Sequence, residues 1–218
     1  VTTDMYKPYI DLAKKVFPHA NIVVDKFHIV QLLTRELNKL RINEMKKLNT
    51  RSREYKILKR YCKIPLRRKR DLNSIYFYKN RHFKNMTSSI DILDYMLKEF
   101  PNLKEAYDFY QNFLLSISNN DVAMLEYILN TRTDKIPMCF RKSIKTLKKL
   151  RKYVVNSLKY DYTNAMVEGK NNKIKVIKRV SYGYRSFRNF KARIMLMERY
   201  KIQKGNIHSY QFAMDAAA

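Results

Sequence analysis

The sequence predicts an α/β fold that is mostly helical overall, with a short strand–helix–strand unit followed by a long run of helices. Three observations predict it. Strand-like apolar segments that end in an acid occur only within the first 25 residues. Beyond residue 28, apolar side chains recur at helical spacing. The 218 residues include only 3 glycines, so few tight hairpins are expected.

The first 25 residues are expected to form two parallel strands joined by a helix. Residues 1–3 are β-rich and precede Asp4, Pro8 fits the first turn of a helix, and the apolar residues 21–24 precede Asp25. Ligands of parallel sheets gather at the carboxyl ends of strands, where both acids fall. The alternative for Asp4 is a structural role as the N-cap of the following helix.

Residues 31–158 are expected to be a helical region without a defensible strand. Apolar spacing predicts helices over residues 29–48, 51–62, 88–97, 101–114, 121–129 and 137–158. Ser88 and Asp91 form a capping box at the start of the third of these helices. Residues 64–70 are expected to be a basic loop, and the segment up to residue 85 has no assigned structure.

The stretch T-N-A-M-V-E-G-K-N-N-K-I-K-V-I-K-R, residues 163–179, predicts a helix capped by Thr163 or Asn164. One broad face is polar or charged and carries Asn164, Glu168, Asn171, Asn172, Lys175 and Arg179. The apolar residues that can turn toward a core are Met166, Val167, Ile174 and Ile177. A carboxylate among phosphate-binding groups suits a divalent metal beside a nucleic-acid strand. The alternative is a solvated basic helix with one incidental acid.

The chain after residue 179 is expected to turn at Gly183 and to form a final helix that is capped by Ser186. This helix and the preceding one would make a C-terminal segment, residues 159–201. Residues 202–218 are expected to be a loose tail.

The charge of the chain points to a polyanionic partner. Lys and Arg total 46 against 19 Asp and Glu, which gives a formal net charge of +27. Nucleic acid is the commonest partner of so basic a folded chain. A membrane surface is the rival, but the basic residues run along the whole chain and do not line one amphipathic helix.

The two cysteines, Cys62 and Cys139, lie far apart and have no further Cys or His at ligand spacing. They predict neither a zinc site nor a disulfide scaffold, and they fit a reducing compartment. No apolar run approaches the roughly 18 residues of a membrane-spanning helix, and no signal peptide is evident. We therefore expect a cytoplasmic, DNA-associated protein with no membrane partner.

The motif D-K-F-H places Asp25 and His28 three residues apart directly after a strand. If a helix begins there, both side chains share one face and could hydrogen-bond the main chain or a phosphate beside an active centre. The structural alternative is that Asp25 caps the helix and His28 is hydrogen-bonded in the core.

Four segments together resemble the DDE transposases of bacterial insertion sequences, specifically the ISL-three group. They are T-T-D-M-Y-K-P-Y at 2–9, V-V-D-K-F-H-I-V at 23–30, T-N-A-M-V-E-G-K-N-N-K-I-K at 163–175 and K-R-V-S-Y-G-Y-R-S-F-R-N-F at 178–190. Their order and the long helical stretch between the second and third also match. The resemblance covers residues 1 to about 201.

The resemblance implies a ribonuclease-H-like core whose acids bind two Mg²⁺ ions. Asp4 matches the second acid of the catalytic triad and Glu168 the third, while Asp25 and His28 match an auxiliary D-x-x-H element. Residues 1–30 would be part of the core and residues 31–158 a helical insertion. The first acid belongs upstream of Asp4, so we expect a core truncated at its N-terminal side that cannot cut DNA alone.

The leading hypothesis is thus a fragment of a DNA transposase that acts on insertion-sequence ends and target DNA, as a homo-oligomer. Asn164, Asn172, Lys175 and Arg179 would steady phosphates beside the metal. The basic helical insertion would grip DNA through Lys145, Lys148, Lys149 and Lys152. One alternative is a non-catalytic nucleic-acid-binding protein whose tyrosines stack on unpaired bases. Another is a helical scaffold for acidic protein partners.

Overall fold

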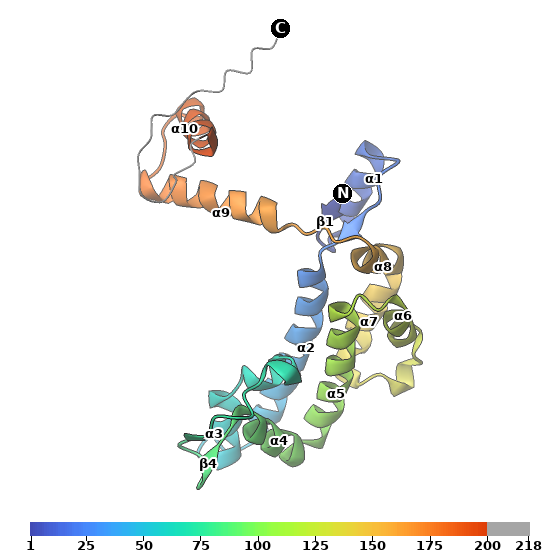
Figure 1. Cartoon of the computed structure of the whole chain (residues 1–218), viewed down its shortest axis with the longest axis vertical. Coiled ribbons are helices and arrows are strands. Elements are labelled where there is room, and N and C mark those ends of the chain that lie inside the picture. The colour runs from blue at the N-terminus through green and yellow to red at the C-terminus, as the bar shows by residue number, and fades with distance from the viewer. Residues whose placement is uncertain (200–218) are drawn as a thin grey trace. The chain divides into compact units, whose positions relative to one another are not determined.

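The computed structural model describes residues 1–199 and divides into two units (Figure 1). The first unit comprises residues 1–163, and the second begins at residue 164. The tail expected over residues 202–218 lies outside the described residues.

The first unit opens with the predicted parallel pair. Strand β1 (Thr2–Thr3) pairs with β2 (Val23–Val24), with Thr2 opposite Val23, and helix α1 (Lys7–Val16) connects them. Asp4 and Asp25 directly follow the two strands, as predicted. The N-cap position of α1 is Tyr6, so the alternative that made Asp4 the cap of this helix is wrong.

The rest of the first unit is mostly helical and packs around one large hydrophobic core. That core contains buried residues from Val24 to Leu158. Helix α2 lies beside α5, and α3 and α4 lie at the end of α2 that is remote from β1 and β2 (Figure 1). The α-helices are α2 (Lys26–Lys46), α3 (Arg53–Arg60), α4 (Ser89–Glu99), α5 (Pro101–Ser118), α6 (Val122–Asn130), α7 (Arg141–Lys149) and α8 (Arg151–Lys159). Short 3-10 turns cover Ile64–Leu66, Lys69–Asp71, Thr133–Lys135 and Met138–Phe140.

Local sequence signals account for several of these helices. The capping box of Ser88 and Asp91 forms in both directions at the start of α4. Pro101 occupies the first turn of α5, where a missing N–H costs nothing. Asp121 caps α6 by accepting from the N–H of Met124 at 2.9 Å. These three boundaries were predictable because each depends on neighbours in the sequence.

The prediction of a single helix over residues 137–158 is wrong. A 3-10 turn precedes α7, and the chain breaks at Leu150, where φ is −102° and ψ is 14°. The break lets α8 pack on β2, where Asn156 donates to the carbonyl of Ile22 at 2.8 Å. Tertiary packing therefore redirects a segment whose periodicity alone reads as continuous.

The expectation that the helical region lacks strands is also wrong. Strands β3 (Tyr78–Lys79) and β4 (Met86–Thr87) form an antiparallel hairpin between α3 and α4. No glycine makes the connection. Instead the Asn80 side chain donates to both the carbonyl and the hydroxyl of Thr87, at 3.1 and 2.6 Å. An asparagine can tie a hairpin in this way without the Gly signal on which the sequence analysis depended.

The second unit consists of α9 (Ala165–Val180) and α10 (Phe187–Arg199), which pack against each other. Tyr182 has a φ of 51° and Gly183 a φ of 103°, and their N–H groups donate to the carbonyls of Arg179 and Lys178. This is a Schellman-type helix end, so the predicted turn is confirmed, although Tyr182 occupies its first left-handed position.

The apolar face of α9 is only partly buried. Ile177 is buried and Ile174 is half-buried, as expected. Met166 and Val167, which were expected to face a core, are exposed. The two lie in the first turn of α9, whereas Ile174 and Ile177 lie further along the helix.

Candidate catalytic corner and nucleic-acid contacts

Asp4 and His28 meet at the carboxyl ends of the parallel strands. Asp4 follows β1, and His28 lies in the first turn of α2, directly after β2. The Nε2 of His28 lies 2.9 Å from Oδ1 of Asp4, with side-chain exposures of 25% and 45%. Two residues that are 24 positions apart thus form a carboxylate–imidazole contact that remains open to solvent. We refer to Asp4, Asp25 and His28 as the acidic corner.

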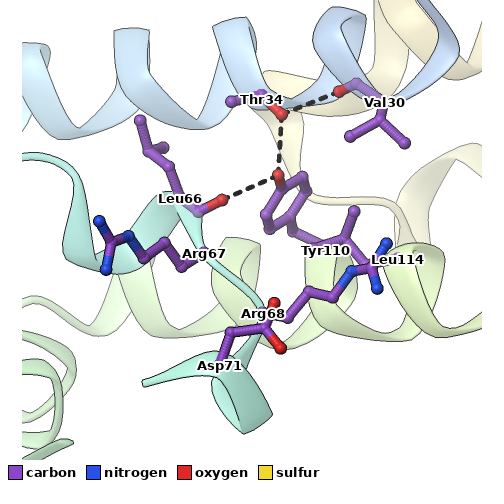
Figure 2. Close-up of a pocket in the computed structure, with 8 residues that line it drawn as sticks. All are labelled: Val30, Thr34, Leu66, Arg67, Arg68, Asp71, Tyr110 and Leu114. Atoms are coloured by element: carbon purple, nitrogen blue, oxygen red, sulfur yellow. Dashed lines mark hydrogen bonds between the residues drawn. The ribbon is translucent and has the colours of Figure 1, made fainter. Parts of the chain in front are cut away.

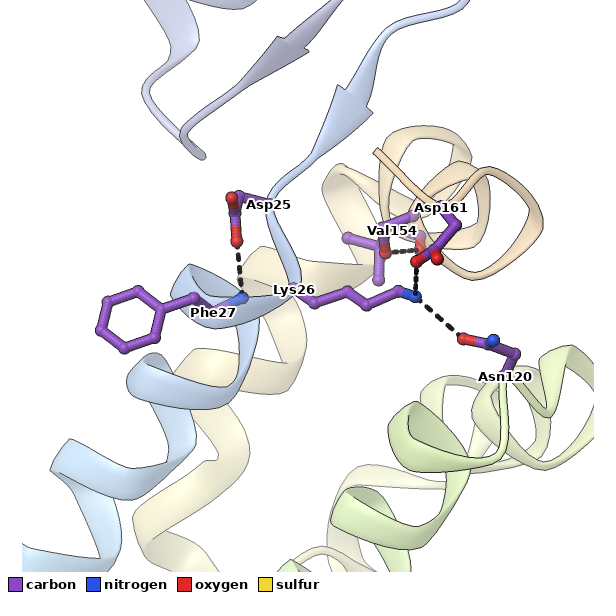
Figure 3. A network of polar contacts seen from close by, with 7 residues as sticks. Asp25, Lys26, Phe27, Asn120, Val154 and Asp161 are labelled. Carbon is purple, nitrogen blue, oxygen red and sulfur yellow. Dashed lines mark hydrogen bonds and ion pairs between the residues drawn. The ribbon is translucent and has the colours of Figure 1, made fainter. Parts of the chain in front are cut away.

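Asp25 is the buried member of the acidic corner. Its side chain is the N-cap of α2 and accepts from the N–H of Phe27 at 2.8 Å (Figure 3). Its own N–H continues the strand pairing by donating to the carbonyl of Thr3 at 3.1 Å. With an exposure of 6%, Asp25 fixes the point at which the strand becomes helix. The capping role that the sequence analysis held as an alternative is therefore present.

Lys26, the next residue, holds the start of α2 against two other segments. Its Nζ donates to Oδ1 of Asn120 at 3.0 Å and lies 3.3 Å from Oδ1 of Asp161 (Figure 3). Asn120 follows α5 in a left-handed conformation, with a φ of 54°, and Asp161 follows α8. No local pattern predicts this role of Lys26, because both partners are more than 90 positions away in the sequence.

Glu168 lies in the first turn of α9, in the second unit. Its N–H donates to the carbonyl of Asn164, the N-cap residue, at 2.9 Å. An acid in a first turn is favoured by the helix dipole. Other members of the predicted polar face are also exposed on α9, namely Asn171, Asn172, Lys175 and Arg179. The acidic corner thus belongs to the first unit and this face to the second, and their convergence stays a prediction.

The lysines predicted to grip DNA are all exposed. Lys145, Lys148 and Lys149 lie on α7 and Lys152 on α8. Lys148 donates to the carbonyl of Thr131 at 3.2 Å. Within residues 1–199, none of the four forms an ion pair with a carboxylate, which leaves their charge available to a polyanion.

A further basic cleft was missed by the sequence analysis. It has a volume of about 400 Å³ and lies between α2, α5 and the loop after α3. Its residues are Val30, Thr34, Leu66, Arg67, Arg68, Asp71, Tyr110 and Leu114 (Figure 2). The hydroxyl of Tyr110 is 2.8 Å from that of Thr34 and donates to the carbonyl of Leu66 at 3.2 Å. These bonds fix the loop that carries both arginines, which sequence alone showed only as a charge run.

The described residues contain no cluster of three or more His, Cys, Asp or Glu side chains with metal-binding geometry. Both cysteines are free thiols, and burial raises the pKa of Cys139 to about 11. Within the described range, no helix combines the length and apolar character that crossing a membrane requires.

The fold and the corner define a mostly helical protein with an acid–imidazole contact at the ends of parallel strands. A family model described as "Transposase", that of the ISL-three DDE group, matches residues 1–194. The chain therefore belongs to this transposase family.

Comparisons with individual proteins add less. A protein of Lactococcus lactis subsp. lactis named "ATP-dependent protease" is 39% identical over 121 residues. The match covers 56% of this chain and 38% of that relative, so the chain spans less than two fifths of its length. No solved structure matches the chain.

Proposed function

We propose that the chain forms part of the catalytic machinery of a DNA transposase that cleaves and joins insertion-sequence ends. The observation that carries this proposal is the contact between Asp4 and His28 at the carboxyl ends of parallel strands, in a chain of a transposase family. Sheets of this kind place their reactive groups at that edge. The parallel pair supports a ribonuclease-H-like core, to which α9 would bring Glu168.

Mg²⁺ is the ion that the family implies, and the donors fit it in kind. Mg²⁺ prefers oxygen ligands and is usually held by one or two carboxylates, with waters and substrate phosphates completing its shell. Asp4 and Glu168 would supply the two carboxylates. The bound ions would activate a water or a 3′-hydroxyl and stabilise an in-line displacement at phosphorus.

The other residues of the corner would hold rather than react. A carboxylate accepts on both oxygens, so Asp4 can receive the N–H of His28 while it also binds a cation. His28 would fix the rotamer of Asp4 and position the strand to be cut. Asp25 would hold the first turn of α2, and with it His28, against β2.

Phosphate contacts would come from both units of the chain. Asn164, Asn172, Lys175 and Arg179 would steady phosphates next to Glu168. Lys145, Lys148, Lys149 and Lys152 would hold the flanking duplex through salt-sensitive contacts. Two DNA ends must be joined in one reaction, which favours a homo-oligomeric complex.

The name of the Lactococcus relative offers a second activity, ATP-dependent proteolysis. The present sequence contains no G-x-x-x-x-G-K run, the loop with which P-loop proteins bind ATP phosphates. The family assignment also extends over residues 1–194, whereas the relative aligns over 121 residues. We therefore retain the transposase proposal.

The experiment makes two measurements on the full chain. NMR detects line broadening by the paramagnetic ion Mn²⁺, and a binding assay measures the DNA affinity with and without Mg²⁺. If Asp4 and Glu168 share a site, Mn²⁺ broadens the amide signals around both residues. Mg²⁺ should raise the affinity for a labelled duplex, and Glu168→Gln or Asp4→Asn should remove that response. The metal-free affinity of Glu168→Gln should be unchanged or slightly higher, because one negative charge is lost.

Glu99→Gln is the matched control, because it removes an exposed acid at the end of α4. It should keep the full response to Mg²⁺. A response that survives in both Asp4→Asn and Glu168→Gln would contradict the proposal and favour a non-catalytic DNA-binding protein. Broadening around only one of the two acids would show that they do not share an ion.

A further inference from the structure

The hairpin between α3 and α4 exposes a row of large apolar side chains. Ile75, Tyr76, Phe77 and Tyr78 are between 51% and 76% exposed, and Met86 on the facing strand is 60% exposed. Ile75, Tyr76 and Phe77 lie in the segment that leads into β3, and Tyr78 is the first residue of that strand. An exposed apolar patch of this kind marks a binding surface more often than it marks chance. We call residues 75–87 the hairpin surface.

Hydrogen bonds hold the hairpin surface in place, so its exposure is built into the fold. Oδ1 of Asn73 accepts from the N–H groups of Ile75 and Tyr76 at 3.1 and 2.9 Å. Nδ2 of Asn73 donates to the carbonyl of Tyr76 at 2.6 Å. At the other end, Asn80 bonds Thr87 and also accepts from the hydroxyl of Tyr61 at 3.3 Å.

Arg53 of α3 anchors the loop of the hairpin to the helical body. Its guanidinium lies 5.3 Å from the ring centre of Phe83 and 4.9 Å from that of Tyr95. Its Nε donates to the carbonyl of His82 at 2.7 Å. This arginine therefore has a structural role, and the remaining cations of the loop are the candidates for a ligand.

The segment that contains α3 and the hairpin carries a concentrated positive charge. Between residues 51 and 87 the sequence has thirteen Lys and Arg but only two acids, Glu54 and Asp71. Arg53, Arg81, His82, Phe83 and Lys84 line a cleft of about 310 Å³. Burial lowers the pKa of His82, and Arg60, Arg81, Lys56 and Arg53 lower it further. Within residues 1–199, neither Arg81 nor Lys84 forms an ion pair.

We propose that the hairpin surface binds a single-stranded segment of DNA, an inference that rests on the proposed function. Bases stack on Tyr76, Phe77 and Tyr78, while Arg81 and Lys84 hold the phosphates at the adjacent cleft. Single-strand binding combines aromatic rings with cations. The rings stack on the flat faces of the bases, and the cations pair with the charged phosphates of the backbone. A second copy of this chain is disfavoured as the occupant, because two surfaces of equal positive charge repel each other.

The test measures the affinity of the full chain for labelled oligothymidine and for a duplex of the same length, by fluorescence anisotropy. Tyr76→Ala with Tyr78→Ala removes two exposed rings of the hairpin surface. Stacking predicts a loss of roughly tenfold or more in single-strand affinity, with duplex affinity nearly unchanged. Arg81→Ser with Lys84→Ser should reduce the salt dependence of single-strand binding by about 1.4 in slope.

Tyr127→Ala is the control for the rings, because Tyr127 is 76% exposed on α6, outside the hairpin surface. It should leave both affinities unchanged, and circular dichroism checks the fold of every variant. Equal single-strand affinity of the wild type and the ring variant would overturn the inference. The inference would also be overturned if the ring variant kept its single-strand affinity but lost binding to phosphatidylserine vesicles, or lost self-association in sedimentation. The hairpin surface would then bind a membrane or a second copy of the chain.

The two proposals fail in different ways. If the wild type binds duplex with a Glu168-dependent response to Mg²⁺ while the ring variant matches it on single strands, only the hairpin inference is wrong. If the wild type binds neither form of DNA, the proposed function fails as well.

Discussion

The two ends of α2 carry different chemistry. At its first turn, next to the parallel strands, Asp25 caps the helix and His28 contacts Asp4. Near its last turns, Arg41 binds α3, the helix that leads into the hairpin surface. A helix of 21 residues is roughly 30 Å long at 1.5 Å per residue. The acidic corner lies at one end of α2 and the hairpin surface near the other, and α2 is about as long as one helical turn of duplex DNA, roughly 34 Å.

The difference suggests a division of labour within one rigid element. The corner fixes each acid through local hydrogen bonds, so its geometry can serve a reaction. The hairpin surface leaves its rings uncovered, so it can serve binding. If this division is right, damage at one end of α2 should stay local to that end, and three predictions test it.

The largest effect is expected at the hairpin end, from Arg41→Met. Arg41 is 6% exposed, and its Nη1 donates to the carbonyl of Leu58 at 2.7 Å. Two further bonds reach Oδ1 of Asn38. Met keeps much of the stem volume but leaves the Leu58 carbonyl unpaired, which should lower the free energy of unfolding by about 2 kcal/mol. Urea unfolding measures the loss, and amide exchange should rise in α3 and the hairpin.

Arg35→Met is the control on the same helix, because Arg35 is exposed and bonds only Gln31 within the described residues. It should change the unfolding free energy by less than about 0.5 kcal/mol. Faster exchange at β1 and β2 in Arg41→Met would mean that the two ends of α2 are not independent.

A smaller effect is expected at the corner, from Asp25→Ala. Loss of the cap that Asp25 gives Phe27 should cost about 1 kcal/mol. Asp25→Asn keeps an oxygen that can accept the same bond and should retain most of the stability. Asp121→Ala removes a comparable cap from α6 and should cost a similar amount without changing exchange at the corner. If Asp25→Asn is as unstable as Asp25→Ala, the charge of Asp25 matters beyond capping.

The parts of the fold that the sequence predicted are those set by near neighbours. Capping at Ser88 and Pro101 at a helix start depend on residues within one turn. The rule that parallel strands bring their carboxyl ends to one edge predicted the positions of Asp4 and Asp25, whereas the contact of Asp4 with His28 comes from the structure. The pairing itself spans 24 positions and follows from the register of Thr2 with Val23.

The parts that sequence did not predict depend on distant partners. The chain breaks at Leu150 because α8 packs on β2, and no local residue signals it. The hairpin surface was missed because side-chain hydrogen bonds of Asn73 and Asn80 hold it, and no glycine in this segment signals a turn. Lys26 seemed an ordinary basic residue because Asn120 and Asp161 come close only in the folded chain.

The smallest expected effect concerns the titration of His82 at the hairpin end. Burial and the neighbouring cations Arg60, Arg81, Lys56 and Arg53 lower its pKa below the ordinary value of 6.5. Between the folded and the unfolded pKa, the unfolded chain binds more protons. The contribution of His82 to stability is therefore full above pH 6.5 and is lost as the pH falls through its folded pKa. NMR titration of the imidazole should give a midpoint below 6.5.

Two changes should raise the midpoint of His82. Arg81→Ser removes one of the cations that lower the pKa, whereas Lys15→Ser, on α1, should leave the midpoint unchanged. Bound oligothymidine should also raise it, because a phosphate at the cleft favours the imidazolium. Single-strand affinity should then increase as the pH falls from 7.5 toward 5.5, by linkage with the proton taken up. A midpoint that oligothymidine does not move would place the phosphates away from His82 and restrict the bound strand to the rings of the hairpin surface.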